Sequence, residues 1–208
     1  MSRRLPLPAA LLSPALLIPA LLLAGCTTAP GAADDGAAQP SASTAADGGD
    51  ARPATVDGPH LVVAGLVFDP ITDDVDPDGV CDGMAGRETL EVFDRAPWPE
   101  LDVPAGGATM TCGNASGAGW RHIADGHTGD FGELADLVGA EWEDVAWFAI
   151  DRALEEPTRV EAYRDDIVNY DVLVELVDDE QVERSWMVTV GFGLGSEQII
   201  TSFPDEQH

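Results

Sequence analysis

The feature that most constrains the fold is a long segment with almost no bulky apolar side chain. After Cys26 the chain reads TTAPGAADDGAAQPSASTAADGGDARPATVDG, which ends at Gly58. Such a segment cannot bury enough surface to offset the entropy of ordering it, so we expect residues 26–58 to be a disordered tether. The folded part is then confined to residues 59–208, and we expect it to be one globular domain with a single core.

The residues before the tether resemble a bacterial lipoprotein signal peptide. Arg3 and Arg4 precede the run LPLPAALLSPALLIPALLLAG, whose prolines disfavour a stable membrane-spanning helix. The sequence LAGC, Leu23–Cys26, is similar to the lipobox of bacterial lipoproteins. This resemblance implies that residues 1–25 are cleaved off and that lipid, such as palmitate, is attached to Cys26. We therefore expect a protein anchored in the cell membrane on its extracytoplasmic face; plain secretion is the alternative.

The cysteine count agrees with this location. The chain has three cysteines, and if Cys26 carries lipid, Cys81 and Cys112 remain as a pair in an oxidising compartment. We expect a disulfide that closes a loop of about 30 residues, worth roughly 3–4 kcal/mol in the chain-entropy description. Zinc binding is the competing use, but the usual C-x-x-C spacing is absent.

The charge restricts the possible partners. The chain has 38 acidic and 10 basic residues, every basic one is Arg, and the formal charge is −28. A surface this negative repels nucleic acid, which proteins bind through several Lys or Arg contacts to phosphate. We expect contact with the membrane through the lipid on Cys26 and with an unidentified protein or small molecule. If the chain were an immunity or decoy protein, its acidic surface would suit a basic target.

The first half of the domain reads as short strands joined by long loops. Strands are expected at residues 60–68, 88–95 and 106–112 from their β-branched residues and alternating apolar positions.

Helices are expected next. The first, 117–125, would be capped by Ser116 and ended by Gly126, and a second, 131–138, would be closed by Gly139. The strongest pattern is at 141–156, before Pro157, with an apolar stripe at helical spacing: Trp142, Val145, Ala146, Ala149, Ala153 and Leu154.

Four strands are expected after the helices, at residues 158–164, 170–176, 182–192 and 197–203. The fold class is therefore α+β: an antiparallel sheet of about four strands packed on one long helix, preceded by a short-strand region that a disulfide holds together.

Two histidines, His122 and His127, lie five positions apart in GWRHIADGHTGDF. On a regular helix this spacing places them about 140° apart, so one helix face cannot present both to a metal. If Gly126 instead ends the helix in a left-handed conformation, the two imidazoles could come together and divide acid and base roles.

This segment, followed by a long helix, strands and the closing TSFP of Thr201–Pro204, resembles the RNase toxin domains of the barnase–EndoU–colicin–RelE-like fold. The resemblance covers residues 119–204. It implies metal-independent RNA cleavage by His122 and His127, with Thr201 holding the phosphate and Arg121, Arg159 or Arg184 stabilising the developing charge.

A calcium loop is a further hypothesis, because DVDPDGVCDG contains the pattern D-x-D-x-D-G. Asp74, Asp76, Asp78 and Asp82 would occupy loop positions 1, 3, 5 and 9, but position 12 is Ala85 where a bidentate Glu is usual. Such calcium would be structural, and a solvated acidic loop is the alternative. We expect no cofactor to be required.

These observations favour a cell-envelope lipoprotein whose α+β domain binds a partner and is not catalytic. The alternatives are a surface-tethered RNase-like enzyme, and an acidic immunity or decoy protein that neutralises a basic toxin. Trp120, Trp142, Trp147 and Trp186 could form an aromatic ligand site, but the helix stripe favours their being core residues.

Overall fold

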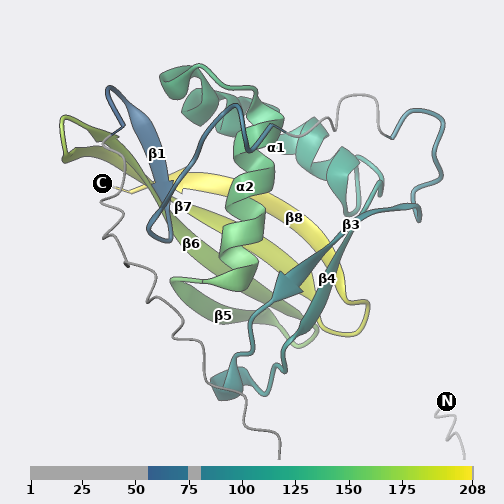
Figure 1. The fold of residues 1–208 in the computed structure, drawn as a ribbon. Helices are drawn as coiled ribbons and strands as arrows, with labels where there is room; N and C mark the ends of the chain where they lie inside the picture. Colours follow the sequence, from purple (N-terminus) through teal and green to yellow (C-terminus); the bar gives the residue numbers. More distant parts are fainter. Residues whose placement is uncertain (1–55, 75–80, 208) are drawn as a thin grey trace, which may run out of the picture. The chain divides into compact units, whose positions relative to one another are not determined.

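The computed structural model describes residues 56–74 and 81–207. In this part of the chain a strongly curled sheet wraps around a helix that lies across its concave side (Figure 1). The sheet has eight strands, in the order β2-β1-β6-β7-β8-β4-β3, with β5 paired to β6. The strands are β1 (His60–Val63), β2 (Leu66–Val67), β3 (Thr89–Arg95), β4 (Gly106–Thr111), β5 (Arg159–Arg164), β6 (Ile167–Asp178), β7 (Gln181–Gly193) and β8 (Gln198–Glu206).

The expected sheet of about four antiparallel strands on one long helix is wrong. The early strands do not form a separate region: β1 pairs with β6, and β4 pairs with β8. The β4–β8 pairing, through Thr109 and Gln198, is parallel, so the sheet is a mixed half-barrel. Periodicity identifies a strand but not its partner, which is why the sequence pattern did not reveal this arrangement.

The expected strand at 60–68 also differs, because it is a hairpin. Ala64 and Gly65 both have positive φ, 48° and 77°, and they turn β1 back into β2. A tight turn of this kind needs residues with positive φ, a backbone conformation that glycine adopts without strain.

The helical segment contains two helices. In α1 (Trp120–Val138), Gly126 lies in the interior and Gly119 is the N-cap, so the predictions that Ser116 caps and Gly126 ends a first helix are wrong. Gly139 ends α1 in the left-handed conformation, with φ 68°, as expected. The strong pattern at 141–156 is confirmed as α2 (Trp142–Glu155), and a short 3-10 helix, η1 (Pro99–Leu101), joins β3 to β4.

The core lies between α2 and the concave face of the sheet. Alternate residues of the two longest strands, β6 and β7, are buried, which reflects the two-residue period of a strand with one covered face. The α2 stripe is buried with them except Trp142, which is partly buried. Buried members from these three elements include Val168, Tyr170, Val172, Val174, Val188, Val190, Val145, Ala149, Ile150 and Leu154.

Within the described residues, neither helix combines the length and the apolar character that crossing a bilayer requires. Residues 1–55, which contain the predicted signal peptide, the lipobox and most of the predicted tether, lie outside the described residues.

Candidate functional site

The predicted histidine pair lies where α1 runs along β8. The Gly119 amide at the start of α1 donates to the Ile200 carbonyl, 3.1 Å away. Further along, the His127 ring contacts the Phe203 ring, with 5.4 Å between centroids. Near the far end, Arg184 of β7 bonds Glu133 of α1 and Glu206 of β8. α1 and β8 therefore run side by side in the same direction.

The two imidazoles are close although the helix continues between them. Their centroids are 6.0 Å apart and their planes are nearly perpendicular, at 88°. His122 Nδ1 lies 3.0 Å from the Ala115 carbonyl, and His127 Nδ1 lies 3.0 Å from Asp130 Oδ2. Each ring thus has a hydrogen-bond partner of its own.

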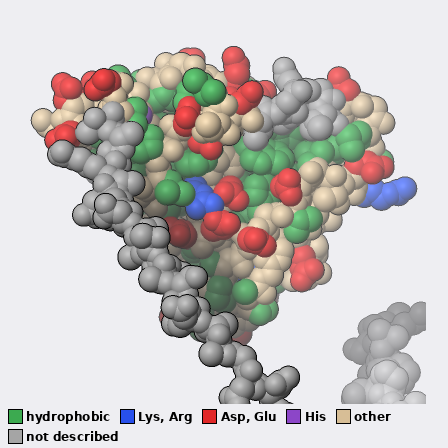
Figure 2. All heavy atoms as spheres, in the orientation of Figure 1, with side chains coloured by type: hydrophobic (Ala, Val, Ile, Leu, Met, Phe, Trp, Pro, Cys, Tyr) green, Lys and Arg blue, Asp and Glu red, His purple; other side chains and the backbone are tan. Residues whose placement is uncertain are grey.

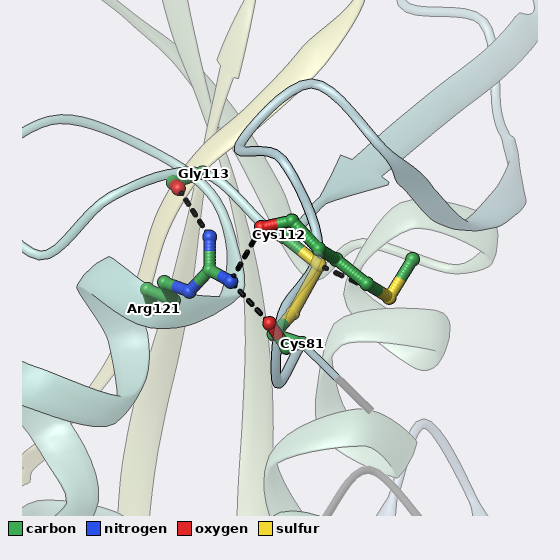
Figure 3. The surroundings of a disulfide bond; sticks show 5 residues. Cys81, Cys112, Gly113 and Arg121 are labelled. Carbon is green, nitrogen blue, oxygen red and sulfur yellow. Dashed lines mark hydrogen bonds between the residues drawn. A yellow bond between two sulfur atoms is a disulfide. The ribbon is translucent and has the colours of Figure 1, made fainter. Parts of the chain in front are cut away.

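The other two predicted catalytic residues have different surroundings. Thr201 pairs with Gly191 of β7, and its buried hydroxyl oxygen has no hydrogen-bond partner among residues 56–74 and 81–207. Arg121 is not placed to bind a substrate phosphate, because its guanidinium donates to the carbonyl groups of Gly113, Met84 and Cys81 (Figure 3).

These Arg121 contacts surround the predicted disulfide. Cys81 and Cys112 are bonded to each other, with Cα atoms 5.5 Å apart, as expected. The Arg121 amide also donates to the Cys112 carbonyl at 3.0 Å. Arg121, in the first turn of α1, thus joins both ends of the disulfide to the helix, Cys81 through its side chain and Cys112 through its backbone amide, so its role here is structural.

The calcium hypothesis stays a prediction. Asp76 and Asp78 lie outside the described residues, whereas Asp74 and Asp82 are described and exposed. Within the described part, no three His, Cys, Asp or Glu side chains are grouped so that they could hold a metal ion.

A different site is formed by a recess between the face of α2, β3 and the loop after β2. We call it the acidic recess. Its cavity volume is about 350 Å³, and its lining residues are Thr72, Asp73, Asp74, Glu91, Phe93, Trp147, Phe148 and Asp151.

The walls of the acidic recess combine aromatic rings with carboxylates. Phe93 and Trp147 pack against each other with centroids 5.2 Å apart, and Trp147 also meets the edge of Trp120 at 5.4 Å. These contacts hold the half-buried Trp147 ring in place. No Arg is among the lining residues, so the recess combines fixed aromatic surface with negative charge.

The charge of one of these carboxylates is partly balanced. Asp151 accepts hydrogen bonds from Arg152, which also bonds Glu155. Burial lowers the pKa of Arg152, but the hydrogen bonds and charges of Asp151 and Glu155 outweigh it and raise that pKa. Figure 2 shows the wider setting: Asp and Glu side chains are spread over this face, around hydrophobic surface, with little Arg.

The expectation about tryptophans holds for two of them. Trp120 and Trp186 are buried, whereas Trp142 and Trp147 are only partly so. Trp147 and Asp151 lie four positions apart on one helix face, and this spacing was the one sequence signal for the recess. The partners from residues 72–74 and from β3 could not be found that way, because only the tertiary fold brings them to α2.

No protein-family model, curated protein or solved structure matches this chain.

Proposed function

We propose that this chain is an outward-facing envelope lipoprotein, anchored by lipid on Cys26, whose domain binds a positively charged organic group. The observation that carries the proposal is the acidic recess, where Asp73, Asp74 and Glu91 line the same cavity as Trp147. An aromatic face attracts a cation through its quadrupole, and Trp is the strongest of the aromatic side chains in this respect.

The location in the envelope fits this ligand class. Outside the cell, salt screens charges beyond roughly 8 Å, so the formal charge of −28 acts mainly through groups close to the ligand. A recess with several carboxylates and a hydrophobic wall retains its attraction under these conditions. The cation is a quaternary ammonium or guanidinium group, either of a small molecule or of a basic side chain on a partner protein, which is the chemistry an immunity or decoy protein would also use.

RNA cleavage has less support. Arg121 is engaged by three carbonyl groups, and the overall charge opposes an RNA phosphate. RNA cleavage is the second candidate because the centroids of the two imidazoles lie only 6.0 Å apart. Incubation of the purified chain with RNA tests it.

The ligand class is tested by titrating the purified chain with tetramethylammonium and with arginine methyl ester, using calorimetry and tryptophan fluorescence. We expect binding, and we expect Trp147→Leu to weaken it about 5- to 30-fold, since a desolvated cation–π contact contributes roughly 1–2 kcal/mol. Glu91→Gln should weaken it less, and Glu180→Gln, a matched change in the exposed β6–β7 turn, should have no effect. Failure of both probes to bind, or equal binding to Trp147→Leu, contradicts the proposal.

The anchor is tested separately by labelling cells with palmitate and fractionating them. We expect label and membrane association in the native chain, and neither in Cys26→Ser. A label-free native chain in the membrane fraction would contradict lipid attachment without affecting the recess.

A further inference from the structure

A second recess lies at the other end of the seam between α2 and β3, and we call it the Arg95 recess. Its cavity volume is about 420 Å³, within the range of small-molecule sites. It is lined by Asp94, Arg95, Ala96, Pro97, Ala105, Gly106, Glu155 and Glu156. Neither the RNase resemblance nor the proposed cation site uses it.

Arg95 is the unusual residue of this recess. Only 6% of it is exposed, yet among the ion pairs of the described residues none includes it. A guanidinium that is removed from water without a carboxylate partner is costly to bury.

Aromatic residues hold Arg95 in place but do not neutralise it. Its Nη1 donates to the Tyr170 hydroxyl at 2.8 Å, and its Cζ lies 4.5 Å from the centroid of the Phe192 ring. Its Nε is buried and has no acceptor in the part of the chain that the structure describes. The group is therefore fixed in direction, and no described carboxylate lies within ion-pair distance of it.

The remaining nitrogen, Nη2, lies beside Gly106. A Cβ placed on Gly106 would be 3.4 Å from Nη2, so the absence of a side chain leaves room next to this nitrogen. Because Gly106 also lines the recess, Nη2 is the donor that an entering anionic group can reach.

The rim of the recess has the opposite charge. Asp94 and Glu156 are exposed there, and Glu155 is bonded to Arg152. A simple anion approaching Arg95 would be repelled by these carboxylates, and a simple cation would be repelled by Arg95. A ligand with a carboxylate at one end and an ammonium group nearby matches both.

We propose that the Arg95 recess binds a zwitterion of the α-amino acid class. Its carboxylate accepts a hydrogen bond from Nη2 of Arg95, and its ammonium group lies among the rim carboxylates Asp94 and Glu156. Charge-assisted bonds of this kind are about twice as strong as neutral ones, and they supply the anion that the buried guanidinium lacks. This site is independent of the acidic recess, although Arg152 bonds a residue of each.

The test uses the purified full chain and calorimetry. The probes are glycine, leucine and glutamine, with acetate as the anion alone and leucinamide as the cation alone. We expect at least one amino acid to bind, and acetate and leucinamide to bind at least about tenfold more weakly than it.

Two glycine variants separate the site from general effects on folding. Gly106→Ala keeps Arg95 and places a methyl group beside Nη2, so amino acid binding should fall at least about tenfold. Gly195→Ala, in the open β7–β8 turn with nothing within 4 Å, should bind as the native chain does. Asp94→Asn combined with Glu156→Gln should weaken leucine but leave acetate unchanged or tighter.

Several outcomes would overturn the proposal. These are no binding of any of the three amino acids, unchanged affinity in Gly106→Ala, and acetate binding as tightly as leucine, which would indicate a plain anion site. If leucinamide bound as tightly as leucine and Trp147→Leu abolished both, the ligand would belong to the acidic recess instead. The experiments can therefore contradict the proposal for one recess without contradicting the proposal for the other.

Discussion

Arg121, which the sequence analysis considered as a catalytic residue, has a structural role instead. As a cation next to His122 it was a candidate for stabilising charge in a reaction, but its guanidinium meets the carbonyls of Gly113 at 3.1 Å and Met84 at 2.9 Å and also that of Cys81. Its type and spacing fit both roles, because an Arg donates equally well to a phosphate and to backbone carbonyls.

We predict that Arg121→Met lowers the free energy of unfolding by about 2–4 kcal/mol, since it leaves part-buried carbonyls without their donor. Chemical denaturation followed by tryptophan fluorescence measures this. The matched change Arg87→Met, at an exposed position, should stay within about 0.5 kcal/mol of the native chain. Equal effects of the two variants would argue that the carbonyl contacts contribute little.

The disulfide gives a second prediction. Replacing Cys81 and Cys112 together by Ala should lower stability by about 3–4 kcal/mol, because a crosslink over 31 residues restricts the unfolded chain. Thermal melting with and without reductant measures it: reduced native chain and the double variant should melt at similar temperatures. A reductant-insensitive midpoint in the native chain would refute the prediction.

At the scale of elements, α1 carries several glycines with opposite structural roles. Gly119 has φ 83°, and a Cβ there would lie 2.5 Å from the Thr111 carbonyl oxygen. Gly126 and Gly129 lie in the helix interior with nothing within 4 Å of an added Cβ. The first glycine is required by the close approach of α1 to β4, and the other two are not.

We therefore predict that Gly129→Ala raises stability by about 0.5–1 kcal/mol, through helix propensity and a less flexible unfolded chain. Gly119→Ala should lower it by at least about 2 kcal/mol, because strain and a backbone clash act together. Denaturation midpoints of the two variants decide this, and a shift in the same direction for both would contradict the assignment.

A buried carboxylate of β6 joins this strand to β5 through an ion pair and to β7 through a hydrogen bond. Asp171 of β6 is 2% exposed and accepts hydrogen bonds from Arg159 of β5 and Thr189 of β7. The hydrogen bonds and charge of Asp171 raise the pKa of Arg159.

Arg159→Met should cost about 1–3 kcal/mol, because it leaves a buried carboxylate without its cation, while the exposed position of Arg159 limits the effect. Adding Asp171→Asn should recover part of that loss. A double-mutant cycle measures the coupling, and strictly additive losses would show that the pair is not coupled.

At the scale of the whole molecule, charge and site geometry lead to one expectation about RNA. We predict that the purified chain leaves single-stranded RNA intact, because the net charge is −28 and Arg121 is held by carbonyl groups. Gel analysis of RNA incubated with the chain and with His122→Ala and His127→Ala measures this. Cleavage that either substitution abolished would contradict the prediction and restore the RNase candidate.

Patterns within short stretches of the sequence were enough to predict many local elements of the described domain. It predicted α2, the left-handed end of α1 at Gly139 and the pairing of Cys81 with Cys112, and it placed most strands within a few residues of where they lie. Periodicity and helix capping depend on residues that are close together in the sequence, and cysteine parity needs only a count. These signals can therefore be read without knowledge of the fold.

The pairing of the strands and the side chains that share a recess become visible in the folded chain alone. The parallel contact of β4 with β8, and the approach of β3 to α2 that creates both recesses, join segments far apart in the chain. Arg95 illustrates the reason: in the sequence it is one charge on a strand, and only the fold places it against Tyr170 and Phe192 with no ion-pair partner among the described residues. Burial and pairing are properties of packed surfaces, which no local pattern contains.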